Sequence, residues 1–86
     1  MENLILDKLN SDGALYRFQG IIQALDGGIC STSIAKRIQE LESDRALIAG
    51  REVGKYATAV LHIMGIKKYS GTDAVIGELT EGLKKK

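Results

Sequence analysis

Residues 15–28 read LYRFQGIIQALDGG, and this stretch decides the fold class. Its apolar residues recur every three to four positions, which places them on one face of an α-helix: Leu15, Phe18, Ile21, Ile22 and Leu25. The pair Gly27–Gly28 follows, and glycine readily adopts the left-handed conformation that ends many helices. The stretch therefore predicts an amphipathic helix that ends at the glycine pair.

The same periodicity recurs on both sides of this stretch. Further helices are expected over about residues 4–9, 34–42, 53–64 and 73–83. The stretch that begins with Ser43 has two interpretations: Ser43 and Asp44 cap a new helix, or the third helix continues through Leu47 and Ile48. The fold class is therefore all-α, with four to five short helices packed as a compact bundle or as two stacked helix-turn-helix pairs.

Length and composition indicate one small soluble domain. The chain has 86 residues, of which 44% are hydrophobic and 27% charged, so residues 1–86 form a single domain with a modest core. No run approaches the roughly 20 apolar residues of a membrane span, and Glu2 stands where a signal peptide carries positive charge. A single cysteine, Cys30, suits a reducing compartment. We expect a cytoplasmic protein.

The two halves of the sequence match each other at an offset of about 38 residues. Residues 38–41 read IQEL and residues 76–79 read IGEL, within quasi-repeats at about 14–43 and 52–83. Helix pairs of this length are the units of helical repeat proteins. Over residues 14–83 the chain resembles a pair of HEAT-type repeats, although it contains no proline, which is common in the turn of that family. This resemblance implies a protein-binding scaffold.

Residues 21–48 carry a second resemblance. An apolar helix is followed by a glycine turn, by serines, and by a charged helix that contains RIQELE at residues 37–42. This order resembles the coiled-coil-forming helical region of the large serine recombinases of phages and mobile elements. The chain has a single cysteine, so the four cysteines of the zinc ribbon of that family are absent, and no trace of its catalytic serine domain is seen. The resemblance implies an interaction helix pair in a phage or mobile-element DNA transaction.

Small residues recur at helical spacing in the middle of the chain and form the candidate interaction face: Ala46, Gly50, Gly54, Ala57 and Thr58. A glycine inside a helix costs about 1 kcal/mol relative to alanine. A second helix that presses its backbone against this line would recover that cost. Alternatively, Gly50 ends one helix and Gly54 lies in the first turn of the next.

The charges give little support for nucleic-acid binding. The net charge is +1, whereas dedicated nucleic-acid domains are usually clearly basic. The candidate contacts to phosphates or to an acidic partner are Lys36, Arg37, Lys67, Lys68, Lys84, Lys85 and Lys86. Because of these residues, a small DNA-binding regulator stays an alternative function. The simpler interpretation of the last three lysines is a solvated tail.

The sequence predicts no enzyme, no metal site and no cofactor. His62 is the single histidine and Cys30 the single cysteine, too few for the three or four ligands that zinc requires. We expect His62 to be a boundary residue of a helix, and Cys30 to be a small buried side chain rather than a reactive thiol. The leading hypothesis is a non-catalytic module that binds a protein partner or a second copy of itself.

Overall fold

The structure is a computed structural model that describes residues 2–28, 31–67, 71 and 73–84. The described residues form α1 (Glu2–Leu9), α2 (Ala14–Gly27), α3 (Thr32–Glu40), the 3-10 helix η1 (Leu41–Ser43), β1 (Leu47–Ile48), β2 (Arg51–Glu52), α4 (Val53–Ile63) and α5 (Ala74–Lys84). The prediction of an all-α bundle of short helices is confirmed.

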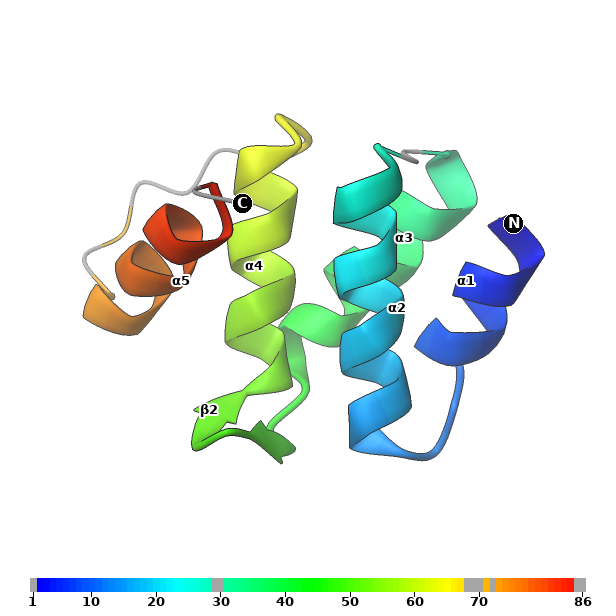
Figure 1. Ribbon diagram of the computed structural model, residues 1–86, viewed down its shortest axis with the longest axis horizontal. Helices are drawn as coiled ribbons and strands as arrows, with labels where there is room; N and C mark the ends of the chain where they lie inside the picture. The colour runs from blue at the N-terminus through cyan, green and yellow to red at the C-terminus, as the bar shows by residue number, and fades with distance from the viewer. Residues whose placement is uncertain (1, 29–30, 68–70, 72, 85–86) are drawn as a thin grey trace.

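Helix α4 lies at the centre of the bundle. In Figure 1, α2 and then α1 stand on one side of α4, with α3 behind them, and α5 stands on the other side. Helices α1 and α2 run antiparallel and pack closely against each other. Helix α4 contacts α2, α3, η1 and α5, whereas α1 packs on α2 and α3. Helix α4 therefore joins α5 to the rest of the bundle.

The core is made of the apolar stripes that the periodicity predicts. Each helix from α1 to α4 contributes two or more buried side chains, because residues three to four positions apart share one helix face. The central cluster consists of Ile5, Leu9, Ile21, Ala24, Ile34, Ile38, Leu41, Val53, Ala57, Val60 and Leu61. Most residues of the predicted helix faces thus join one hydrophobic core, but Leu15 of the predicted face on α2 is 54% exposed.

The turn between α2 and α3 begins at the predicted glycine stop and ends at a serine cap. Gly28 has a φ of 62° and closes α2 in the left-handed conformation. The Ser31 hydroxyl accepts a hydrogen bond from the Ile34 amide at 3.3 Å and caps the start of α3. Cys30 lies outside the described residues.

The segment after Ser43 is neither of the two helices that the sequence predicts. Helix α3 tightens into η1 and stops at Ser43, and residues 47–52 form an antiparallel hairpin in which Ile48 pairs with Arg51. Its two-residue turn has positive φ at both positions, 54° at Ala49 and 80° at Gly50. Such turns match the twist of hairpin strands. Both predictions for residues 43–48 were therefore wrong, because the turn reverses the chain.

The two quasi-repeats differ in their packing. In the second, α4 and α5 pack directly on each other, whereas in the first, α2 and α3 each pack on α1 and on α4. Helix α1, which precedes both quasi-repeats, packs on both helices of the first one.

Candidate functional site

The structure divides the predicted interaction face: Gly54 and Ala57 are buried, Ala46 and Thr58 are half-buried, and Gly50 is exposed. The two buried residues belong to α4, and Gly50 occupies the hairpin turn. Gly54 lies in the first turn of α4, as the alternative interpretation predicted, whereas Gly50 ends no helix. A Cβ atom on Gly54 would lie 2.2 Å from the Glu42 carbonyl oxygen and 2.9 Å from that of Asp44. A backbone does press on this line, but it belongs to η1 of the same chain, so the prediction of an exposed face for a partner helix is corrected.

Polar contacts fix η1 on α4 at this point. The Gly54 amide donates to the Asp44 carbonyl at 2.8 Å. The Thr58 hydroxyl lies 2.9 Å from a Glu42 carboxylate oxygen, and Lys67 pairs with the other oxygen at 2.8 Å. Thr58 and Lys67, both candidate binding residues, therefore act within the fold.

Most described cations are likewise paired within the chain. Arg37 donates to the Leu9 carbonyl at 3.3 Å and lies 3.5 Å from Glu40. Lys36 on α3 and Lys84 at the end of α5 are exposed, and they lie on elements that do not pack on each other. Lys68, Lys85 and Lys86 lie outside the described residues. The part of the chain that the structure describes therefore gathers no basic surface.

Two aspartates have lowered pKa values for structural reasons. Burial alone would raise the pKa of Asp44, but the hydrogen bond from the Ala46 amide and the Arg17 guanidinium, 2.7 Å away, outweigh it and lower that pKa. The pKa of Asp73 is lowered chiefly by the Lys55 ammonium. Asp73 also accepts hydrogen bonds from the Val75 and Ile76 amides at the start of α5. Asp44 thus stabilises the turn before β1, and Asp73 caps the start of α5.

An apolar groove runs along the outside of the α1/α2 pair. One hollow of about 470 Å³ is lined by Leu4, Asp7, Lys8, Ser11, Tyr16 and Gln23. A second of about 450 Å³ is lined by Leu4, Ile5, Gln23, Asp26 and Gly27. The two hollows share Leu4 and Gln23 and therefore adjoin, and we call them together the α1/α2 groove. Their lining residues come from α1, from α2 and from the turn between them.

The α1/α2 groove presents apolar side chains to solvent. Leu4 is 66% exposed and Tyr16 is 55% exposed. Beneath them, Gly20 allows a close approach of the two helices, since a Cβ atom there would lie 3.1 Å from the Leu9 amide nitrogen. The groove therefore has a tightly packed floor and an exposed apolar edge.

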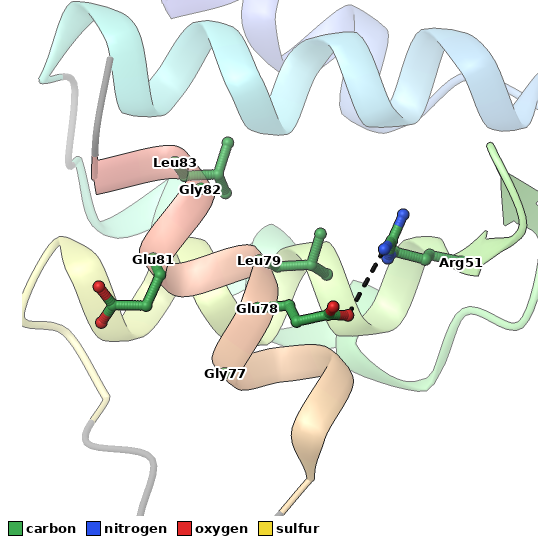
Figure 2. A pocket seen from close by; sticks show the side chains of 7 residues that line it. All are labelled: Arg51, Gly77, Glu78, Leu79, Glu81, Gly82 and Leu83. Carbon is green, nitrogen blue, oxygen red and sulfur yellow. Dashed lines mark hydrogen bonds and ion pairs between the residues drawn. The ribbon is translucent and has the colours of Figure 1, made fainter.

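A third hollow, of about 670 Å³, lies between α5 and β2. Figure 2 shows Leu79 and Leu83 projecting from the same side of α5, with Glu81 pointing away. Arg51 and Glu78 meet across its mouth at 3.5 Å. Because both leucines are half-buried and the two charges satisfy each other, this hollow exposes less apolar surface than the α1/α2 groove.

The described residues give no sign of a metal site or a membrane span. Their His, Cys, Asp and Glu side chains do not gather in groups of three or more that could hold a metal ion. None of their helices is long and apolar enough to cross a bilayer. His62 is half-buried near the end of α4.

Sequence reasoning did not find the α1/α2 groove, although it had one signal. Leu4, Ile5 and Leu6 are consecutive, and three consecutive helical residues span about 200° of the helix circumference. One core face cannot cover them all, so an exposed leucine was to be expected on α1.

Comparisons with known protein families, with curated proteins and with solved structures found no match to this chain. The resemblances to the recombinase coiled-coil region and to HEAT-type repeats therefore stay predictions.

Proposed function

We propose that this chain is a non-catalytic protein-binding module whose α1/α2 groove receives a short amphipathic helix of a partner protein. The observation that carries the proposal is the pair Leu4 and Tyr16, each more than half exposed beside a hollow. Burying a leucine side chain contributes about 1.5–3 kcal/mol. A helix laid in a groove recovers this energy through apolar anchors at i, i+3 or i+4, and i+7.

The dimensions of the groove suit such a helix. Its lining on α2 extends from Tyr16 to Gly27, which corresponds to roughly 16 Å along the helix axis. A partner helix of about three turns covers that length and presents three anchors. We expect the middle anchor to lie near Leu4 and Gln23, which line both hollows.

A partner helix accounts for the groove better than the two alternatives do. The apolar faces of α2, α3 and α4 pack mainly in the core, so a second copy would offer mainly its own α1/α2 groove. The groove carboxylates, Asp7 and Asp26, would then face their counterparts in the other copy. A DNA-binding regulator needs clustered cations, whereas Arg17, Arg37, Arg51, Lys55 and Lys67 are paired within the chain. The single cysteine further supports action in the cytoplasm.

The test is a selection from a displayed library of helical peptides, followed by NMR mapping of a recovered binder on the 15N-labelled protein. We expect shifts at Leu4, Tyr16 and Gln23. Leu4→Ser and Tyr16→Ser should each weaken binding more than tenfold. Leu47→Ser is the matched control, because Leu47 is 65% exposed on β1, outside the groove. All three variants should keep the native circular dichroism spectrum.

The proposal is overturned if the library yields no binder, if the NMR shifts lie outside the groove, or if Leu47→Ser weakens binding as much as Leu4→Ser does. Sedimentation that shows a dimer dissolved by Leu4→Ser would replace the partner helix by a second copy of the chain.

A further inference from the structure

Two carboxylates stand on opposite walls of the α1/α2 groove. Asp7 belongs to α1 and Asp26 to α2, and both are exposed. Neither makes a hydrogen bond or an ion pair with another described residue. The groove's one described cation, Lys8, donates to the Gln19 side chain at 3.4 Å. The groove therefore keeps at its rim two carboxylates that no described residue pairs.

We infer that the partner helix is cationic, with a lysine or arginine on each edge of its apolar stripe. This inference rests on the proposed function of the groove. An apolar helix alone would fill the hollows but would bring uncharged groups against two carboxylates. A cation at each edge would reach a carboxylate while the anchors fill the hollows, and long basic side chains extend readily along apolar surface.

The helix geometry sets the spacing of the two cations. Leu4 and Gln23 line both hollows, so they lie at about the same level of the antiparallel pair. Asp7 and Asp26 each follow one of them by three positions, and the two helices run in opposite directions. At 1.5 Å per residue the carboxylates are about 9 Å apart along the groove, which is about six residues of a partner helix.

A six-residue spacing also places the cations on opposite edges of the partner helix. At 100° per residue, six positions correspond to 600°, so the two side chains diverge by about 120° around the axis. An apolar stripe roughly 100° wide fits between them. One spacing therefore satisfies both the axial distance and the opposite walls.

The test compares two fluorescein-labelled peptides by anisotropy. Both carry leucines at i, i+4 and i+8; one has lysines at i+1 and i+7, six positions apart on the two edges of the leucine stripe, and its twin has glutamates there. We expect the lysine peptide to bind at least tenfold more tightly at 50 mM salt, with the difference reduced at 500 mM salt because the rim is exposed. Asp7→Asn and Asp26→Asn should each weaken the lysine peptide about two- to fivefold. The control Glu81→Gln, on α5, should leave it unchanged.

The two proposals fail in distinguishable ways. Equal binding of both peptides, still lost in Leu4→Ser, overturns the cationic partner and leaves the groove as the binding site. The same holds if the binders recovered from the library map to the groove but show no enrichment of lysine or arginine at the stripe edges. Binding of either peptide that Leu4→Ser does not affect overturns both proposals, as does failure of both peptides when the library binders map elsewhere.

Discussion

Substitution of Gly54 by alanine should displace η1 from α4 and lower the stability of the fold. The added Cβ atom would lie 2.2 Å from the Glu42 carbonyl oxygen and 2.8 Å from the Glu42 carbonyl carbon. No rotamer change can relieve this contact, because the obstructing atoms belong to the backbone. The chain must move η1 outward, which also strains the hydrogen bond from the Gly54 amide to Asp44.

The size of the effect follows from opposing contributions. Overpacking a well-packed site costs about 1–3 kcal/mol, and the weakened hydrogen bond adds about 1 kcal/mol. Alanine regains up to about 1 kcal/mol of helix propensity. Since a backbone clash belongs at the upper end of the first range, we expect the free energy of unfolding to fall by about 2–3 kcal/mol. The midpoint of thermal unfolding should then drop by roughly 10–20 °C.

Gly77→Ala is the matched control for this prediction. Gly77 also lies in a helix, and nothing stands within 4 Å of the Cβ position there. The same substitution should therefore raise stability by about 0.5–1 kcal/mol. Urea unfolding followed by circular dichroism at 222 nm measures both variants. The packing argument is refuted if Gly54→Ala is as stable as the native chain, or if the two variants shift in the same direction.

Two further predictions concern charge and turn geometry. Because the pKa of Asp44 is lowered in the fold, its contribution is present above the unfolded value of about 3.9 and is lost as pH falls through the folded value. Arg17→Met should lower the free energy of unfolding by about 2 kcal/mol at pH 7. In urea titrations the variant should lose less stability than the native chain between pH 5 and pH 2. If it loses as much, Arg17 does not cause the lowered pKa of Asp44. Ala49→Asn should stabilise the hairpin by about 0.5–1 kcal/mol, since Ala49 has a φ of 54° and asparagine tolerates positive φ better than alanine does. A lower urea midpoint for Ala49→Asn would contradict this view of the turn.

The helices could be predicted from sequence because each carries its own local signal. Leu15 to Leu25 repeat at helical spacing, and Ser31 and Gly28 are residues whose backbone or side chain suits a helix end. None of these signals needs knowledge of a distant residue. The periodic faces then had to meet in one core, since no helix this short is stable alone.

The hairpin could not be predicted in the same way, because its signal is weak and its stabilisation is tertiary. The turn residues are Ala49 and Gly50, whereas a turn with two positive φ angles usually has the sequence Asn-Gly or Asp-Gly. The strands have two residues each. They are supported by the Tyr56 hydroxyl, which donates to the Ile48 carbonyl at 3.3 Å, and Tyr56 in turn packs edge-on against Phe18.

The small-residue line shows why a correct physical signal still misplaced the binding face. Gly54 costs helix propensity, and a close backbone does compensate for it, but sequence alone cannot distinguish a backbone of the same chain from that of a partner. Here the segment that supplies the contact, residues 42–44, lies a short loop away along the chain. A nearby segment loses little entropy on closing such a loop, so it competes favourably with any partner for a small-residue line. The exposed face must then be sought where a helix carries more apolar residues than one core can cover, as α1 does with Leu4, Ile5 and Leu6.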